Sequence, residues 1–400
     1  MNVFKKLYCR SFQFALNLCM PLLPYREPIL LKNYTHLADT LAVEGKTNAL
    51  IVTDKGVRGI GLTKAFEQAL ADANIRYTIY DGVVANPTTA NVEQAVACYK
   101  SNGCDCLIAI GGGSAMDCAK ATGAVIVRPN TPLGKMKGIM KVRKKLPLLV
   151  AIPTTAGTGS ETTLAAVITD SETRHKYAIN DFPLIPKYAL LDADLTVGLP
   201  KSVTATTGMD ALTHAVEAFV GQSTTRQTRK NAQQAVKLIF DNLELAYNDG
   251  GNILARTNML NASYLAGLAF TKSYVGYVHA VAHSLGGKYN VAHGLANAVI
   301  LPIVLRKYGK KVHKKLWQLG LYAGLFGKDT AVDEGAKLFI DKIETMNAHM
   351  GIPQAIDGIV PSEIPELAQT AEREANPLYP VPVLYDARQL AEIYFAIIAK

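Results

Sequence analysis

The chain has 400 residues, more than the roughly 100–200 residues that one domain commonly contains, so we expect two domains. It is 49% hydrophobic and 19% charged, with 31 glycines and 18 prolines, which excludes a disordered chain, a collagen-like repeat and a disulfide scaffold. Its net charge of +9 comes from two basic clusters, residues 135–145 and 306–315. No nucleic-acid-binding motif accompanies these clusters, so we interpret them as solvated faces and expect no nucleic-acid partner.

Residues 1–27 form an N-terminal extension in which basic residues precede an apolar stretch. Lys5, Lys6 and Arg10 precede a largely apolar stretch, residues 12–23, which is shorter than the ~18 residues of a membrane-spanning helix. No small-residue cleavage site follows it, so we do not interpret it as a signal peptide. We predict an amphipathic helix that lies either on the protein or in peripheral contact with a membrane surface. The six cysteines lack a Cys-x-x-Cys metal spacing and indicate reduced thiols in a cytoplasmic protein.

Residues 28–200 alternate short β-branched runs with amphipathic helical stretches. This alternation is typical of βαβ units and a mostly parallel sheet, so we predict an α/β dinucleotide-binding domain. The expected strands are residues 48–53, 77–80, 106–110, 148–152 and 188–191, and the expected helices between them are 62–73 and 92–101.

Residues 201–400 have a different pattern, in which long helical periodicities are separated by glycine pairs. We predict an all-α C-terminal domain over these residues. The expected helices include residues 202–220, 232–245, 255–269 and 277–285, the last ended by Gly286-Gly287.

Two glycine-rich loops follow strands of the first domain. One strand continues into Gly111-Gly112-Gly113-Ser114, and a helix with Asp117 and Lys120 comes next. Glycines let the backbone approach a ligand, and the N–H groups at a helix N-terminus bind phosphate. The second loop, residues 153–161, includes Thr154 and Thr155. Either loop alone fits a plain strand-to-helix turn, but two at strand carboxyl ends favour a nucleotide site.

Asp54 closes the first strand of this domain. An acidic residue there can accept hydrogen bonds from a ribose 2′-hydroxyl, which favours NAD over NADP. A turn aspartate before Lys55-Gly56 is an equally good interpretation of the same pattern.

Four histidines of the helical half fall in two short windows. Asp210 and His214 are four residues apart, as are His279 and His283, and His293 follows after a short connection. On helices this spacing places each pair on one face. Buried imidazoles and a carboxylate are costly unless they are hydrogen-bonded or ligated, and one aspartate with three histidines suits Fe(II), Zn(II), Mn(II) or Co(II). A metal site is therefore our prediction, and a hydrogen-bonded core network is the alternative.

Four motifs in this order make the chain similar to the iron-containing (group III) alcohol dehydrogenases, from about residue 28 to near the C-terminus. The motifs are Gly111-Gly112-Gly113-Ser114-x-x-Asp117-x-x-Lys120, the loop of residues 153–161, the helix of residues 208–217 and the segment of residues 276–294.

This resemblance implies an NAD-binding domain, a helical domain that binds Fe(II), with Zn(II) as a second option, and a reaction in the cleft between them. It assigns Asp210, His214, His279 and His293 as metal ligands, and it places His283 at the nicotinamide and substrate as the catalytic residue. The residues that it assigns to the cofactor are Asp54, Asn86, Gly112, Gly113, Ser114, Asp117, Thr154, Thr155, Val167 and Lys176.

The function that follows is a metal-dependent transfer of hydride between NAD(H) and a primary alcohol or aldehyde, with the metal acting on the substrate oxygen. A diol dehydrogenase acting on glycerol, propanediol or lactaldehyde stays open as an alternative, and so does a lyase similar to dehydroquinate synthase. The aromatic residues Phe270, Tyr274 and Tyr277 near the metal motifs fit an apolar alcohol and simple helix packing equally well. The resemblance also implies a homo-oligomer.

Overall fold

The computed structural model describes residues 1–173 and 175–399, and the chain divides into two compact units. One unit consists of residues 24–196, and the other combines residues 1–23 with residues 197–400. The N-terminal extension therefore packs with the helical half of the chain. The two units are described one after the other.

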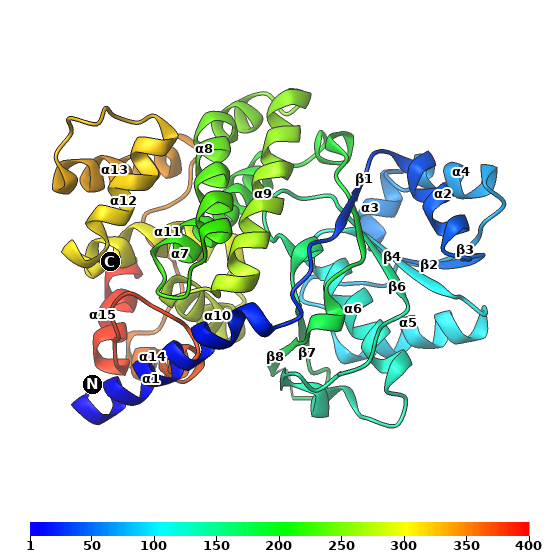
Figure 1. Ribbon diagram of the computed structural model, residues 1–400, viewed down its shortest axis with the longest axis horizontal. Helices are drawn as coiled ribbons and strands as arrows, with labels where there is room; N and C mark the ends of the chain where they lie inside the picture. The colour runs from blue at the N-terminus through cyan, green and yellow to red at the C-terminus, as the bar shows by residue number, and fades with distance from the viewer. Residues whose placement is uncertain (174, 400) are drawn as a thin grey trace. The chain divides into compact units, whose positions relative to one another are not determined.

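A six-stranded sheet, parallel throughout, forms the centre of the unit of residues 24–196 (Figure 1). The strand order is β1-β9-β6-β4-β2-β3. The central strands β2 and β4 are buried along their whole length, as parallel strands covered on both faces are. The bounds are β1 Ile29–Leu31, β2 Asn48–Val52, β3 Arg76–Tyr80, β4 Cys106–Gly111, β6 Leu148–Pro153 and β9 Tyr188–Leu190.

Helices cover both faces of this sheet. Phe66 and Leu70 of α4 pack with Ile51 of β2 on one face, together with α2, whereas Val92 of α5 and Met116 of α6 pack with Leu50 on the other. Residues Asn48–Val52 thus alternate between two cores, which is what the period-two geometry of a strand requires. The bounds are α2 Tyr34–Val43, α3 Lys55–Gly59, α4 Lys64–Asp72, α5 Thr89–Ser101 and α6 Gly113–Val127.

A second, three-stranded sheet in the same unit was not predicted from the sequence. Its order is β5-β8-β7, with β7 (Ala165–Thr169) antiparallel to β8 (Lys176–Asn180) and the two-residue β5 (Gly138–Ile139) at the edge. Ala166, Ile168 and Ile179 belong to the same core as α6. This sheet matters for the site because Val167 and Lys176 lie in it.

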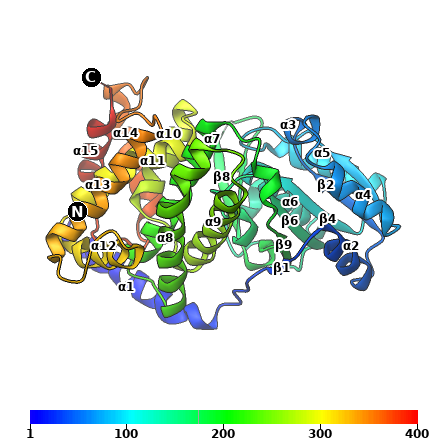
Figure 2. The same ribbon diagram turned by 90° about the horizontal axis from the view of Figure 1, so that it is seen from above.

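In the second unit, the secondary-structure elements of the described residues are helices. Helices α7, α8 and α9 lie side by side (Figure 2). The predicted fold class, a parallel α/β domain followed by a helical domain, is confirmed. The bounds are α7 Lys201–Val220, α8 Arg226–Asn248, α9 Ile253–Ser273, α10 Tyr277–Tyr289, α11 His293–Tyr308, α12 Lys310–Ala323, α13 Val332–His349, α14 Ile364–Ala375 and α15 Ala387–Ile397.

The predicted end of one helix is wrong. Gly286-Gly287 does not end α10, which continues to Tyr289. The helix stops at Asn290, which adopts the left-handed conformation (φ 55°) that commonly follows a helix C-terminus. Two glycines lower helix propensity, but packing of the preceding apolar turns overrides that local preference.

The N-terminal extension forms α1, Val3–Cys19, followed by a short 3₁₀ turn, η1, Met20–Leu22. Helix α1 contacts its own unit at Glu372 of α14, through Lys5, and at the Tyr379 carbonyl, through Gln13. No helix in the described part of the chain is long and apolar enough to cross a membrane. The other short 3₁₀ helices are η2 Leu133–Met136, η3 Ser160–Thr162, η4 Phe182–Leu184, η5 Ala193–Thr196 and η6 Pro361–Glu363.

Candidate active site

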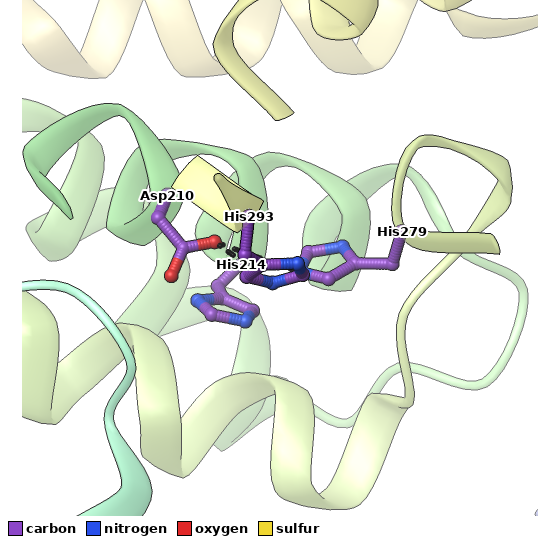
Figure 3. Close-up of side chains that lie close together, drawn as sticks. All are labelled: Asp210, His214, His279 and His293. Atoms are coloured by element: carbon purple, nitrogen blue, oxygen red, sulfur yellow. Dashed lines mark ion pairs between the residues drawn. The ribbon is translucent and has the colours of Figure 1, made fainter. Parts of the chain in front are cut away.

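Three helices of the second unit bring Asp210, His214, His279 and His293 together (Figure 3). Asp210 and His214 lie one turn apart on α7, His279 is on α10, and His293 is the first residue of α11. One potential ligand atom from each residue lies within 4.8 Å of those from the others. His293 Nε2 is 3.4 Å and His279 Nε2 is 3.8 Å from Asp210 Oδ1. The four side chains assigned by resemblance therefore form one cluster.

The chemistry of this cluster fits a divalent cation. Asp210, His214 and His279 are each no more than 5% exposed. Burial raises the pKa of Asp210 to about 7 and lowers the pKa of His279, so neither charged form is stable there without compensation. A divalent metal supplies that compensation, and a carboxylate with three imidazoles matches the preferences of Fe(II) and Zn(II).

Glu217 orients one of these histidines. His279 Nδ1 donates a hydrogen bond to Glu217 Oε2 at 2.6 Å, which leaves Nε2 as the atom that faces Asp210. Glu217 also accepts from the backbone N–H groups of Gly276 and Val278 at 2.8 Å each, and so fastens the start of α10 to α7. A side chain at position 276 would put a carbon 2.6 Å from Glu217 Oε1, so only glycine fits there. Carboxylates of this kind hold metal-binding imidazoles in one tautomer and orientation.

Asn297 is a second supporting residue. It lies one turn after His293 on α11, is fully buried, and its Nδ2 donates to Asp210 Oδ1 at 2.7 Å. The same nitrogen lies 3.3 Å from His279 Nε2 and 3.2 Å from His293 Nε2. Asn297 thus touches three of the four candidate ligands.

Neither Glu217 nor Asn297 was singled out as a site residue from the sequence. The signal was their helical spacing, because Glu217 follows Asp210 by seven residues and Asn297 follows His293 by four, so each shares a helix face with a candidate ligand.

Phe270 of α9 fixes the ring of His214. The two rings stack with centroids 4.1 Å apart and planes 11° apart, and His279 stacks on His214 at 4.5 Å. Tyr277, by contrast, is a core residue, because it is fully buried and its hydroxyl binds Asn376 and the Tyr385 carbonyl. Phe270 is therefore in ring contact with a candidate ligand, whereas Tyr277 belongs to the core.

His283 lies beside the cluster, one turn after His279 on α10. Its ring stacks on that of His293 with centroids 5.2 Å apart, and its side chain is 34% exposed, so solvent reaches it. Nδ1 lies 2.6 Å from Glu374 Oε1, and Tyr379 donates to the same carboxylate oxygen at 2.8 Å. Burial tends to raise the pKa of Glu374, but the charge and hydrogen bond of His283 hold it below its usual value. Glu374 therefore stays ionised and accepts from His283 Nδ1, which leaves Nε2 as the open nitrogen.

In the other unit, the two glycine-rich loops lie at the carboxyl ends of the adjacent strands β4 and β6. Thr154 N donates to the Gly111 carbonyl at 3.0 Å, and Thr155 lies beside Gly112. Helix α6 begins at Gly113 without a side-chain cap, so its first turn presents backbone N–H groups. Thr155 Oγ1 is buried and has no hydrogen-bond partner among the described residues. These features fit the phosphates of a dinucleotide.

The remaining residues assigned to the cofactor lie around these loops. Asn86 N donates to Ser114 Oγ at 3.3 Å, and Lys176 Nζ donates to Asn86 Oδ1 at 2.8 Å. Asp54 caps α3 by accepting from Val57 N at 2.9 Å, which is the geometry of the alternative interpretation, a structural turn aspartate.

Asp117 and Lys120 of α6 bind protein groups. Asp117 accepts from Val167 N at 3.0 Å and from Ser160 Oγ at 2.8 Å. The fully buried Lys120 Nζ donates to backbone and hydroxyl oxygens of Ser160 and Thr163 and to the Ala165 carbonyl, at 2.6–3.0 Å. Both side chains thus tie the helix behind the first glycine-rich loop to the segment that follows the second.

Family models and individual relatives agree with this architecture. The model described as iron-containing alcohol dehydrogenase matches residues 31–193, and that of the C-terminal region of the same family matches residues 204–398. A 1,3-propanediol dehydrogenase from Citrobacter freundii is 38% identical over 88% of this chain and 91% of its own length. Alcohol dehydrogenase 4 from Saccharomyces cerevisiae is 37% identical over 89% of this chain and 92% of its own.

One solved relative contains the cofactor. The sulfoacetaldehyde reductase from Bifidobacterium kashiwanohense in complex with NAD⁺ superimposes with a TM-score of 0.81 at 26% identity, over 94% of this chain and 98% of that one. The chain belongs to the iron-containing alcohol dehydrogenase family. It is accordingly a metal-dependent oxidoreductase that transfers hydride between NAD(H) and an alcohol or aldehyde, with NAD and iron as the family's cofactors.

Proposed function

We propose that this enzyme interconverts short primary alcohols and their aldehydes, with Asp210, His214, His279 and His293 as the ligands of one Fe(II) ion. The observation that carries the proposal is the cluster itself, three of whose four residues are buried and in which one carboxylate and three imidazoles converge within 4.8 Å. The bound metal would supply a Lewis acid for the substrate oxygen, and NAD would supply the hydride acceptor. Zn(II) suits the same donors and is the second metal to test.

The protein's own groups prepare this centre. Glu217 holds His279 with Nε2 toward Asp210, Phe270 fixes the plane of His214, and Asn297 binds Asp210. A site whose ligands are already oriented loses little entropy when the metal binds, and it excludes alternative side-chain arrangements.

His283 is the proposed proton carrier. Its Nδ1 is engaged by Glu374, its Nε2 is open, and its ring lies against that of His293 while remaining within reach of solvent. An imidazole in this position can take the proton of the substrate hydroxyl at Nε2 and pass it to water, because Nδ1 stays bonded to Glu374 while Nε2 accepts and releases the proton.

In the α/β unit, we propose that NAD binds at the two glycine-rich loops. Gly112, Gly113 and the N-terminus of α6 would hold the diphosphate, together with Ser114 and the hydroxyls of Thr154 and Thr155. Asp117 and Val167 would act by positioning these loops, since they bind each other. Asp54, Asn86 and Lys176 complete the proposed set, with Asp54 toward the ribose.

Two substrate classes remain as candidates. Relatives of nearly equal identity are named alcohol dehydrogenase and 1,3-propanediol dehydrogenase, and the hydroxyls of 1,3-propanediol are primary. We therefore propose the primary alcohol group as the common substrate feature, with monohydric alcohols first and diols second. Phe270, which is half-buried and stacked on His214, supports an apolar substrate, because an aromatic ring offers no hydrogen bond to a second hydroxyl.

A substrate panel with the metal controlled tests this proposal. The protein would be purified without oxygen, stripped with a chelator and reloaded with Fe(II) or Zn(II), and NADH formation would be followed with ethanol, 1-butanol, 1,2-propanediol and 1,3-propanediol. We expect activity only after metal is restored and the highest kcat/KM with a monohydric primary alcohol. A preference for 1,3-propanediol would move the assignment to the diol class, and full activity of the stripped protein would contradict the metal proposal. The cytoplasmic location and the homo-oligomeric state expected from the sequence stay predictions.

A further inference from the structure

Helix α1 faces outward with its apolar side. Phe4, Leu7, Tyr8, Phe14 and Leu18 are 85%, 64%, 60%, 72% and 69% exposed. Their spacing places them on one face, since each follows another member of the set by three, four or seven residues. The exposed Ser11 and Ala15 fill the gaps between them. The result is a continuous apolar stripe along the helix.

The opposite side of α1 fastens it to its own unit through polar groups. Gln13, 3% exposed, donates to the carbonyls of Pro377 and Tyr379 at 3.2 and 2.7 Å. Arg10 donates to the carbonyls of Val381 and Pro382 at 2.7 and 3.0 Å. Cys9 is 1% exposed on the same side.

This orientation is the reverse of that of an ordinary surface helix. Polar side chains face the protein, where they hydrogen-bond to backbone carbonyls, and large apolar side chains face outward. Scattered exposed apolar residues are normal, but a contiguous apolar patch marks an interaction surface. The family models match residues 31–193 and 204–398, so α1 lies outside the part of the chain that the family shares.

The charge of the segment complements an anionic surface. Helix α1 includes three cationic side chains, Lys5, Lys6 and Arg10, and no aspartate or glutamate. Lys5 is paired with Glu372 and Arg10 donates to protein carbonyls, whereas Lys6 is exposed and forms no ion pair within the described residues. Aromatic and leucine side chains on one face, with cations and no acid elsewhere, is the composition of helices that lie in the headgroup layer of a bilayer.

A second copy of the chain fits this stripe less well. A 17-residue helix is about 25 Å long and about 10 Å wide. The stripe is therefore one narrow strip of surface, and a stable protein interface, to which each partner contributes roughly 800 Å², would have to include other elements of the unit as well. A lipid surface has no such minimum area, because each inserted side chain adds its own transfer free energy.

We propose that the outward face of α1 binds the surface of an anionic lipid bilayer and holds the enzyme there reversibly. This inference does not depend on the substrate or metal assignment.

Vesicle binding of the full-length protein tests the proposal. Flotation with phosphatidylcholine vesicles containing 30% phosphatidylglycerol would be compared for the wild type, the triple variant F4S/L7S/F14S, and a matched control. The control, V43S/I60S/L254S, removes three apolar side chains that are 88%, 70% and 71% exposed elsewhere on the chain. We expect the α1 variant to lose at least tenfold in bound fraction, the control to bind as the wild type, and pure phosphatidylcholine to bind less.

The same three proteins would be measured by light scattering and for alcohol oxidation. The exposed positions predict unchanged activity and melting temperature in the α1 variant, so a loss of vesicle binding could not be ascribed to unfolding. Wild-type protein that does not float with anionic vesicles would overturn the proposal. A wild type that stays off vesicles, combined with a lower molecular mass of the α1 variant, would assign the face to a second copy instead.

Discussion

The two candidate sites of this chain differ in the groups that form them, side chains in one and mainly backbone in the other. The metal cluster consists of side chains, which converge from three helices and are oriented by Glu217, Asn297 and Phe270. The cofactor site consists mainly of backbone, presented by two glycine-rich loops that buried groups such as Lys120 hold in place. We therefore expect each candidate ligand to be essential at the first site. At the second, we expect the residues behind the loops to matter more than those at the surface.

His283 offers the sharpest way to separate chemistry from metal binding at the first site. We expect His283→Ala to lower kcat by 10²- to 10⁴-fold, the usual contribution of a general base, with iron content unchanged. Metal analysis and steady-state rates on the same preparation check this. His313→Ala is the control. His313 pairs with Asp333 away from the cluster, so this substitution should leave both kcat and iron content unchanged. Loss of iron from His283→Ala would make it a ligand.

Replacing Lys120 tests whether the buried hydrogen bonds behind the glycine-rich loops stabilise the candidate cofactor site. Lys120→Met leaves oxygens of Ser160, Thr163 and Ala165 without their donor, so we expect the free energy of unfolding to fall by about 3 kcal/mol. Denaturant unfolding measures this, with NAD affinity determined in parallel. The exposed Lys100→Met is the matched control and should change stability by less than about 0.5 kcal/mol. Equal effects of both substitutions would refute a special role for Lys120.

Replacing Glu217 tests whether its hydrogen bond to His279 contributes to metal affinity. Glutamine keeps the shape but replaces one acceptor oxygen with a donor, whereas all three neighbours, Gly276 N, Val278 N and His279 Nδ1, require an acceptor. We expect Glu217→Gln to weaken metal affinity by 10- to 100-fold. Competition with a chromophoric chelator reports this, and Glu244→Gln on the surface should leave the affinity unchanged. A wild-type affinity in Glu217→Gln would mean that His279 needs no such partner.

Glu161 gives the smallest and most specific effect, a pH dependence of stability. Burial raises its pKa from 4.5 to about 7, so the folded chain holds a proton that the unfolded chain releases. Its contribution is fully present below pH 4.5 and is lost as the pH rises through about 7. Between pH 5 and pH 8 the wild type should therefore lose about 2 kcal/mol relative to Glu161→Gln. Urea unfolding at a series of pH values measures this. If the free energy of unfolding changes with pH by the same amount in both proteins, Glu161 is ionised in the folded chain and the prediction is wrong.

The contrast between the sites also explains what the sequence could and could not predict. The spacing of Asp210 and His214 indicated that both lie on one face of a helix, and the glycines after β4 indicated a phosphate-binding loop. Both signals are local in the sequence. The partners of Lys120 lie 40 and more residues away in a loop and a short strand, and no local pattern indicates them. The small sheet was missed for a related reason, since β5 has two residues and β7 and β8 gain their stability from packing on α6.

The end of α10 shows the same limit. Gly286-Gly287 is a strong local signal for a helix end, yet the helix continues to Tyr289 and stops at a left-handed asparagine. Tertiary packing decides such boundaries, whereas periodicity decides whether a helix exists at all.

The central claim is that one metal ion binds where Asp210, His214, His279 and His293 converge. Diffraction from Fe(II)-loaded crystals on both sides of the iron absorption edge tests it most directly. The account predicts one anomalous peak per chain, within about 2.0–2.3 Å of a carboxylate oxygen of Asp210 and a ring nitrogen of each histidine. A peak bound by other residues, or fully loaded active enzyme with no peak at this cluster, would contradict it.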